Sequence, residues 1–293
     1  MKPTASIPPA LLALAAVGLW STLAIGGVLL RHLPPFLLLG ITLSISGLSA
    51  LAYRGALKTP PLVLLVGVGG IFGYHFLYFR AFALAPAVEA NLINYLWPLL
   101  IVLLSPLLLP GCRLSARHIL GAALGMSGAF LILSGGRVSL QSQYLEGYLL
   151  ALGAALVWAV YSLLTKRLPR FPTGAVSLFC AVSGVLALLV HFSLFHQPGN
   201  PPVLRGGEWL LLAWMGIAPM GVAFFAWDAA LKRGDPRVIG ALAYLTPLLS
   251  TVNLMLFAGQ RINELTLLAM GLILAGSWIS SRPPRRAPAA NPS

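Results

Sequence analysis

Polar and aromatic residues interrupt two apolar stretches of this chain in the same way. Residues 94–100 read "NYLWPLL" and residues 243–249 read "AYLTPLL". An ordinary apolar helix has no need of an amide, a phenol, an indole and a proline in its middle. Amides and hydroxyls can hold charged groups by hydrogen bonds, whereas aromatic rings stack on flat solutes and attract cations. The two segments therefore predict a binding site with polar groups and aromatic walls inside an apolar protein.

More residues of these types share helix faces, because they recur at spacings of three and four positions. Lipid offers polar side chains no hydrogen-bond partner, so they are expected to face other helices or a wet cavity. We expect a small-molecule substrate to be bound by Trp20, His75, Tyr78, Asn94, Tyr95, Trp97, Trp158, Tyr161, Tyr244 and Ser250. Pro98 and Pro247 each remove a backbone hydrogen bond and bend their helices, so they are expected to act as hinges.

Most of these residues also have a purely structural explanation. The deep indoles of Trp20, Trp97 and Trp158 could pack between helices instead of lining a cavity. A hydrogen bond to a neighbouring helix would explain His75, and such bonds by Asn94 would be worth roughly 0.6 kcal/mol each. Trp209, Trp227 and Trp278 fall near the ends of apolar stretches, where indoles usually anchor a helix at the lipid headgroups.

Charged residues inside or beside the apolar stretches are few. Arg80 and Glu89 flank a short connection, which predicts a local ion pair with a gating or coupling role, or two solvated charges. Asp228 lies four residues before Lys232, a spacing typical of an ion pair on one helix. No apolar stretch is expected to contain a pair of buried carboxylates, which argues against a dedicated proton relay. Neither a metal site nor a cofactor is predicted.

The composition indicates a membrane protein. Of the 293 residues, 58% are hydrophobic and 9% are charged, against roughly 45–50% and about 25% in soluble domains. A spanning helix needs about 20 apolar residues. Ten such stretches are predicted, at residues 10–30, 34–53, 62–84, 87–109, 115–134, 146–167, 173–195, 208–231, 237–258 and 263–281. We therefore expect an all-α integral membrane protein with ten transmembrane helices. The stretches contain no nucleophile–base pair and no HExxH motif, so the chain is not expected to be an enzyme.

The distribution of basic residues predicts the orientation. With the N-terminus in the cytoplasm, 14 of the 19 Lys and Arg residues fall on the cytoplasmic side and five on the outer side. Ten spans place both termini in the cytoplasm, in a multi-pass protein of the plasma membrane. The net charge of +13 then reflects topology, so the lipid bilayer, not a nucleic acid, is the expected partner. The oligomeric state stays open, and a monomer is compatible with the sequence.

The chain also repeats itself. "LLALAAVGLW" (11–20) resembles "LLALGAALVW" (149–158), and "GMSGAFLI" (125–132) resembles "LILAGSWI" (272–279). Residues 1–140 and 141–293 are thus predicted to form two five-helix repeats, the second ending in a short basic tail. Because five is odd, the second repeat is inverted in the membrane. Many secondary transporters place a substrate site at the bilayer midplane between such repeats, so we expect a central cavity there.

These features resemble the drug/metabolite transporter superfamily, in particular its ten-helix EamA-type members. Within it, "GYHFLYFRAFALAPAVEANLINYLWPLL" (73–100) together with Trp158 resembles the aromatic amino-acid exporters called YddG. The resemblance implies export of aromatic or other hydrophobic amino acids by alternating access. It also implies that spans 1, 3, 4, 6, 8 and 9 line the cavity, with spans 5 and 10 more peripheral.

Other substrates on the same fold stay open. A nucleotide-sugar carrier would need Lys or Arg deep in its cavity, whereas this chain keeps nearly all cations at the ends of its spans. An exporter of lipophilic cations would favour a buried Glu, and only Glu89 comes near that position.

Overall fold

The computed structural model describes residues 7–195, 204–258 and 263–282, and every element within these ranges is helical. Among the described residues, nine helical segments are long and apolar enough to cross a membrane, and a tenth, Pro35–Leu51, is apolar but shorter. The ten predicted spans are confirmed, with most ends within three residues of the prediction. Four of the charges used for the orientation, Lys2, Arg261, Arg285 and Arg286, lie outside the described residues, as does most of the basic tail.

Several spans are assembled from more than one helix. In chain order, the spans consist of α1 (Pro9–Ser21) and α2 (Leu23–Leu29); α3 (Pro35–Gly47) and η1 (Leu48–Leu51); α4 (Pro61–Val68), η3 (Gly69–Gly73) and α5 (Tyr74–Leu84); α6 (Ala87–Asn94) and α7 (Trp97–Leu108); α8 (Ala116–Ser134); η4 (Ser142–Tyr144) and α9 (Leu145–Arg167); α10 (Ala175–Val190) and η5 (His191–Phe195); α11 (Gly206–Ile217), η6 (Ala218–Val222) and α12 (Ala223–Arg233); α13 (Pro236–Leu242) and α14 (Leu245–Ala258); and α15 (Glu264–Ser281). The short helix η2 (Arg54–Lys58) connects the second and third spans.

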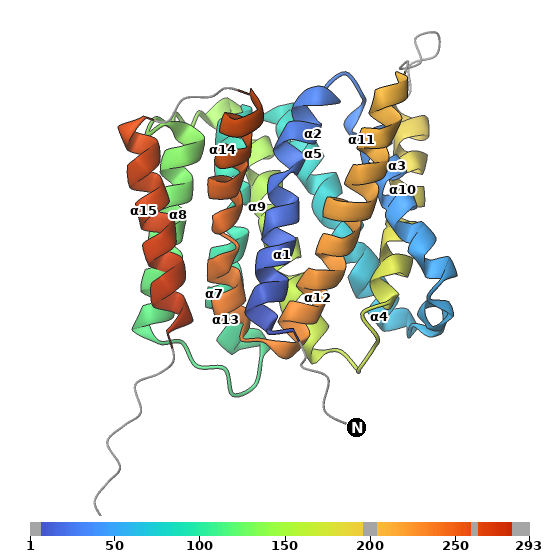
Figure 1. Cartoon of the computed structure of the whole chain (residues 1–293), viewed down its shortest axis with the longest axis horizontal. Coiled ribbons are helices and arrows are strands. Elements are labelled where there is room, and N and C mark those ends of the chain that lie inside the picture. Colours follow the sequence, from blue (N-terminus) through green and yellow to red (C-terminus); the bar gives the residue numbers. More distant parts are fainter. Residues whose placement is uncertain (1–6, 196–203, 259–262, 283–293) are drawn as a thin grey trace, which may run out of the picture.

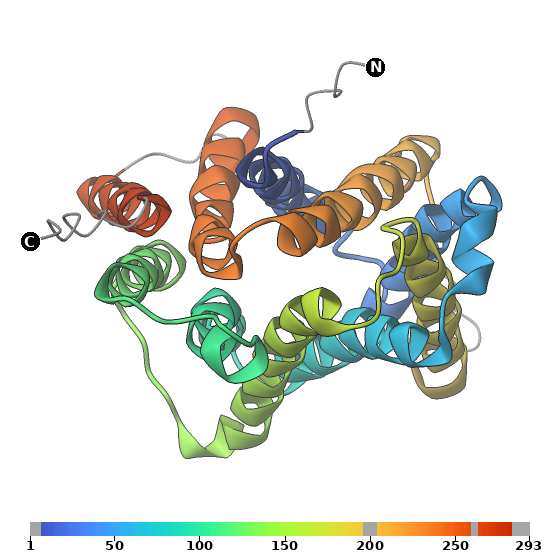
Figure 2. The ribbon, with the colours of Figure 1, turned by 90° about the horizontal axis from the view of Figure 1, so that it is seen from below.

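Helix α1 begins and helix α15 ends on the same face of the bundle, the lower face in Figure 1, which is called the inner face below. This placement agrees with an even number of spans. Seen from that face, α8 and α15 form one edge of the bundle, and α3 and α10 form the opposite edge (Figure 2). The other six spans surround the centre. The expectation that spans 5 and 10 are peripheral is therefore confirmed.

The contacts between helices follow the repeat. The fifth span, α8, packs against its counterpart α15, and α3 of the second span packs against its counterpart α10. The packing of α5 on α9 is matched by that of α12 on α1, which joins the corresponding spans of the opposite halves. A pattern in which each contact reappears after exchanging the halves is what two five-helix repeats around a central axis produce.

Small residues allow α8 and α15 to approach closely. A methyl group added to Gly276 would lie 2.5 Å from the carbonyl oxygen of Gly121, and one added to Gly128 would lie 2.6 Å from that of Ala269. The contacts of Gly128 with Ala269 and Ile273 are thus repeated by those of Gly276 with Gly121 and Gly125. Gly121 and Gly125, four residues apart on α8, are thus typical of the small-residue motifs that pack membrane helices closely.

We expect Gly276→Val to destabilise the protein by about 1–3 kcal/mol, because the added side chain must force the backbones of α8 and α15 apart. The measurement is the midpoint of thermal unfolding in detergent. Gly271→Ala on the same helix is the control, since a methyl group there meets nothing within 4 Å. Equal midpoints for the two variants would contradict the close contact.

Hydroxyl groups and prolines account for the breaks within three spans. Ser21 and Thr22 bond back to the carbonyls of Gly18 and Leu19 at 2.6 and 2.7 Å, in competition with the helical pattern, and α1 ends there. Pro98 has no N–H for the carbonyl of Asn94, where α6 ends. Pro247 likewise cannot donate to the carbonyl of Ala243, one residue after α13 ends, and this carbonyl accepts from the N–H of Thr246 at 3.0 Å instead.

The two prolines therefore lie in the first turn of α7 and near the start of α14, where proline is tolerated. The breaks themselves precede them, at Tyr95–Leu96 and Ala243–Tyr244. The predicted interruption of both helices is confirmed in position to within a few residues. The role of these breaks as hinges stays a prediction.

Candidate functional site

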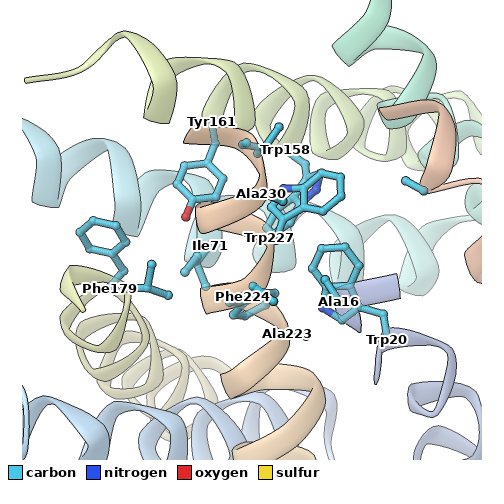
Figure 3. Close-up of a cluster of buried hydrophobic side chains, with 14 of the residues drawn as sticks. Ala16, Trp20, Ile71, Trp158, Tyr161, Phe179, Ala223, Phe224, Trp227 and Ala230 are labelled. Atoms are coloured by element: carbon cyan, nitrogen blue, oxygen red, sulfur yellow. The ribbon is translucent and has the colours of Figure 1, made fainter. Parts of the chain in front are cut away.

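Four tryptophans from four different spans meet at the centre of the bundle. The ring of Trp20 on α1 lies 5.1 Å from that of Trp227, 5.8 Å from that of Trp158 and 6.4 Å from that of Trp97, measured between centroids. Figure 3 shows the side chains of Trp20, Trp158 and Trp227 pointing toward one another. None of the four is more than 9% exposed. The three deep indoles predicted from the sequence thus come together, and in this conformation they fill the space between their helices.

Phe224 completes this cluster, which we call the tryptophan cluster: Trp20, Trp97, Trp158, Phe224 and Trp227. The Phe224 ring lies 5.7 Å from that of Trp158 and 6.0 Å from that of Trp20. Edge-on ring contacts of this kind contribute about 0.5–1.5 kcal/mol each beyond the burial of their surface. The cluster therefore packs α1, α7, α9 and α12 against one another and leaves little open space between them.

Trp227 corrects one sequence prediction. It was expected to anchor its span at the headgroups, yet it is only 2% exposed, and its indole N–H donates to the hydroxyl of Ser162 at 3.2 Å. Its span extends to Arg233, so Trp227 lies almost two turns inside the helix end. Trp209 and Trp278 are 53% and 59% exposed, as anchors should be.

A second group of aromatic and polar residues adjoins the tryptophan cluster. The Tyr74 ring lies 5.1 Å from that of Trp158 and stacks on Tyr78 at 5.7 Å. The Asn94 amide donates to the Tyr74 hydroxyl at 3.2 Å, while its buried carbonyl oxygen has no hydrogen-bond partner among the described residues. Tyr95 is close enough to interact electrostatically with both tyrosines. Tyr74, Tyr78, Asn94 and Tyr95 are called the polar cluster below.

The sequence prediction named Tyr78, Asn94 and Tyr95 but missed Tyr74. Tyr74 lies at the start of α5, directly after the π-helical turn η3. It precedes Tyr78 by four residues on the same regular helix, so the i, i+4 spacing could have identified it. Asn94 is buried, whereas the other three residues of the polar cluster are partly exposed, namely Tyr74, Tyr78 and Tyr95.

His75 faces the tryptophan cluster, with its ring 6.3 Å from that of Phe224. Its Nδ1 lies 2.7 Å from the carbonyl oxygen of Ile71, within the same span. Because a carbonyl only accepts, Nδ1 must carry the hydrogen, and in the neutral ring Nε2 presents a lone pair. The alternative explanation of His75, a hydrogen bond to a neighbouring helix, is therefore not supported for Nδ1, and the ring can still accept one hydrogen bond.

The remaining predicted residues divide into two groups. The Tyr161 ring lies 5.5 Å from that of Trp158, at the edge of the tryptophan cluster. The Ser250 hydroxyl donates to the carbonyl of Ser21 at 3.3 Å, which ties α14 to the break after α1. Tyr244 is fully buried in a separate apolar cluster with Val102 and Ile273. Its prediction as a substrate-binding residue is not supported, because its ring packs against Gly125 instead.

The predicted ion pair between Arg80 and Glu89 does not form. The ion pairs found within the described ranges involve other residues. The Arg80 guanidinium instead lies 6.0 Å from the centre of the Phe195 ring, beside a pocket of about 130 Å³ between α3, α5 and η5. Glu89 lies half-buried in the first turn of α6, where the partial positive charge of the helix end favours it.

Basic side chains tie the helix ends together on the inner face. Lys166 at the end of α9 donates to the carbonyl of Gly234, and Arg167 donates to that of Leu108 at the end of α7. Arg237 at the start of α13 donates to the carbonyl of Arg113. Together these three contacts connect the ends of spans from both halves. We call Lys166, Arg167 and Arg237 the inner latch.

The Arg237 guanidinium donates hydrogen bonds of 2.8 and 2.6 Å to the Asp235 carboxylate, which holds Arg237 in place. Burial alone raises the pKa of the Asp235 carboxyl, but the hydrogen bonds from Arg237 outweigh burial and hold that pKa below its ordinary value. The contribution of this pair is therefore present at neutral pH and is lost only as the pH falls through the lowered pKa. The inner latch is a stable feature under physiological conditions.

Asp228 and Lys232 form the predicted ion pair on α12, with 2.6 Å between Oδ2 and Nζ. Lys232 also donates to the carbonyl of Phe171 at 3.1 Å and lies over that ring. The Asp228 side chain is 1% exposed and its Oδ1 makes no hydrogen bond of normal length in the described part of the chain. Over the same residues, no group of three His, Cys, Asp or Glu side chains gathers as metal ligands would.

The comparisons with known proteins identify the family. The sequence pattern of the EamA-like transporter family matches residues 7–134 and again residues 145–282. The chain belongs to the EamA-like transporter family. It is therefore a multi-pass membrane transporter, and the two matches coincide with the two halves that repeat in sequence and in helix packing.

Relatives of known sequence and structure support this assignment. The chain is 40% identical over 285 residues to the aromatic amino acid exporter YddG of Ancylobacter novellus, covering 94% of this chain and 98% of that protein. It is 28% identical to a probable terminal-alkyne amino-acid exporter of Streptantibioticus cattleyicolor, over 76% and 73% of the two chains. A crystal structure with 41% identity superposes with a TM-score of 0.87 over 93% of this chain and 96% of that one.

Proposed function

We propose that this EamA-like transporter exports aromatic and other large apolar amino acids by alternating access. The observation that carries the proposal is the tryptophan cluster at the centre of the bundle, with the polar cluster beside it. Flat apolar side chains stack on indole and phenol rings, and ammonium groups are attracted to ring faces. The name of the Ancylobacter relative, which shares 40% of its residues with this chain, supports the same substrate class.

In the proposed site the substrate's backbone groups bind to the polar cluster. The unpartnered carbonyl oxygen of Asn94 and the Nε2 lone pair of His75 are acceptors for the substrate ammonium group. The hydroxyls of Tyr78 and Tyr95 are donors for its carboxylate. Trp158, Tyr161 and Tyr74 form the wall against which the side chain stacks. Ser250 contributes by holding α14 against α1, at the edge of this site.

We infer that the present conformation is closed on the inner face. The inner latch joins the helix ends there, and the tryptophan cluster fills the centre above it. The polar cluster keeps partial exposure on the other side. Substrate would therefore reach the polar cluster from the outer face in this state, and from the inner face after the latch and the cluster separate. The breaks before Pro98 and Pro247 are the proposed pivots between the two states.

Counterflow of labelled tryptophan into proteoliposomes tests this function, with threonine and a nucleotide sugar as competing compounds. Tryptophan is expected to exchange and to be displaced by other aromatic amino acids. The nucleotide sugar is not expected to compete, because its phosphates require buried cations, and the inner-latch cations lie at one face of the bundle. Repeating the assay with and without a pH gradient shows whether protons are coupled. Exchange of the nucleotide sugar without tryptophan exchange would contradict the proposal.

We further propose that the protein lies in the plasma membrane with its inner face toward the cytoplasm. The basic residues of the inner face support this orientation through the positive-inside rule. A green fluorescent protein fused to the C-terminus should fluoresce, whereas alkaline phosphatase fused at the same place should be inactive. The opposite result for both fusions would contradict the orientation.

A further inference from the structure

The ion pair of Asp228 and Lys232 lies where a substrate coming from the inner face would first meet the tryptophan cluster. Asp228 directly follows Trp227, whose ring lies 5.1 Å from that of Trp20 and 5.6 Å from that of Trp97. The carboxylate also interacts electrostatically with Tyr161, which borders the cluster. Lys232 lies one turn closer to the inner end of α12 and is held at the Phe171 ring. The pair therefore lies between the inner rim and the cluster.

Asp228 is buried more deeply than the other charged groups of these ion pairs on the inner side. Its side chain is 1% exposed, whereas those of Lys232, Arg237 and Asp235 are 20%, 18% and 34% exposed. Oδ2 of Asp228 bonds to Lys232, and Oδ1 makes no hydrogen bond of normal length in the described residues, although the Thr173 hydroxyl lies close enough to interact with the carboxylate. A buried carboxylate oxygen without a full hydrogen bond is costly. This oxygen can therefore accept a hydrogen bond from a ligand next to the aromatic wall.

We propose that Asp228 and Lys232 form a recognition site for zwitterionic α-amino acids on the inner side of the tryptophan cluster. This inference rests on the proposed function and adds to it a first binding step. When the inner latch opens, the substrate ammonium bonds to the Asp228 carboxylate and the substrate carboxylate bonds to the Lys232 ammonium. The aromatic side chain then stacks on Trp227 and Tyr161.

Charge balance explains why this site selects zwitterions. The ion pair and an amino acid are each neutral overall, so exchanging partners leaves no charge unpaired in a buried site. A plain amine would pair with Asp228 and leave Lys232 without a partner, and a plain carboxylic acid would do the reverse. Leaving one member of a buried pair unpartnered is strongly unfavourable. The pair thus discriminates against molecules that carry only one of the two charges.

The test uses three indole compounds that share a ring but differ in charge: tryptophan, tryptamine and indole-3-propionate. Each competes, unlabelled, against labelled tryptophan in inside-out membrane vesicles, in which the inner face meets the medium. Wild-type protein should prefer tryptophan over each single-charge analogue by about tenfold or more. Asp228→Asn should reduce the preference over indole-3-propionate, whereas Lys232→Gln should reduce the preference over tryptamine.

Opposite changes in the two variants cannot come from a general loss of folding. The double variant Asp228→Asn/Lys232→Gln keeps both shapes without either charge, and it should bind all three compounds with similar affinity. Lys58→Gln is the control, because Lys58 is exposed on η2 outside the ion pair and the inner latch, and it should keep the wild-type preference for tryptophan. Variants that lose transport but keep wild-type preference ratios, or a double variant with those ratios, would overturn the inference. Absence of tryptophan exchange in wild-type protein would instead contradict the proposed function.

Discussion

Replacing Trp158 by alanine is expected to lower tryptophan transport by up to about tenfold, while the amount of protein in the membrane stays near the wild-type level. Its ring touches those of Trp20, Trp97 and Phe224, at centroid distances of 5.8, 6.3 and 5.7 Å. It also lies 5.1 Å from the ring of Tyr74, where the polar cluster begins. Trp158 thus joins the residues proposed to bind the side chain of a substrate to those proposed to bind its charged groups.

The effect should arise from binding more than from stability. Each ring contact is worth about 0.5–1.5 kcal/mol, so a substrate that loses its stacking partner loses roughly one factor of ten. Trp158→Phe keeps a smaller ring and should retain part of the transport. Tyr95→Ala removes a group from the polar side of the same site and should also lower transport. The measurement is uptake into proteoliposomes, normalised to the reconstituted protein.

Trp214→Ala is the matched control for this experiment. Trp214 lies on α11, whereas Trp227 of the tryptophan cluster lies on α12 of the same span. The Trp214 side chain is 50% exposed on the surface of the bundle. The same loss of indole there should leave transport unchanged. If Trp158→Ala transports as well as Trp214→Ala, then the tryptophan cluster only packs helices together. That is the alternative explanation of the deep indoles given in the sequence analysis.

The spans and the meeting of the deep indoles could be predicted because both depend on simple quantities. The length of an apolar run determines whether a helix can cross the bilayer. The distance of a tryptophan from the ends of its span gives its depth, and residues at equal depth in different spans can meet. Trp20, Trp97 and Trp158 satisfied that condition and do meet. Trp227 was placed too near an end because its span, at 28 residues, is longer than the sequence indicated.

Side-chain direction was predicted less well, since it depends on helix phase. Tyr244 was predicted to bind substrate on the assumption that residues 237–258 form one unbroken helix. The chain breaks at Ala243–Tyr244, so α13 and α14 have independent phases, and Tyr244 turns toward Gly125 on α8. The missed Tyr74 is different, because its spacing of four residues from Tyr78 on α5 could have placed it on the same face.

The sequence also could not predict which side chains pair with each other across a short connection between spans. Arg80 and Glu89 are near each other along the chain and opposite in charge, yet Arg80 turns toward Phe195 on η5. Which neighbour a long side chain reaches depends on the packing of a span that is distant in the sequence. The contacts of the inner latch could not be predicted either. Their acceptors are backbone carbonyls, which every residue has, so the residue types do not indicate them.

Removing the inner latch is expected to open the inner face. Lys166→Met together with Arg167→Met deletes the contacts to the carbonyls of Gly234 and Leu108. Partly exposed charged hydrogen bonds are worth about 1 kcal/mol each. Losing two of them shifts the balance between the closed and open states by about 2 kcal/mol, or roughly thirtyfold. Transport should change as well, because one half of the cycle becomes easier and the return to this closed state becomes harder.

Thiol labelling measures the opening directly. In a background with Cys112→Ser and Cys180→Ala, the substitution Ser162→Cys places a single thiol beside Trp227, at a site that is fully buried when the inner face is closed. A membrane-impermeant maleimide applied to inside-out vesicles should label it faster by about tenfold or more when the latch is removed. Lys58→Met is the control, since Lys58 lies exposed on η2 without a hydrogen bond within the described ranges. Equal labelling rates in the latch and control variants would mean that the tryptophan cluster alone holds the inner face closed, because the cluster is the remaining barrier between that face and Ser162.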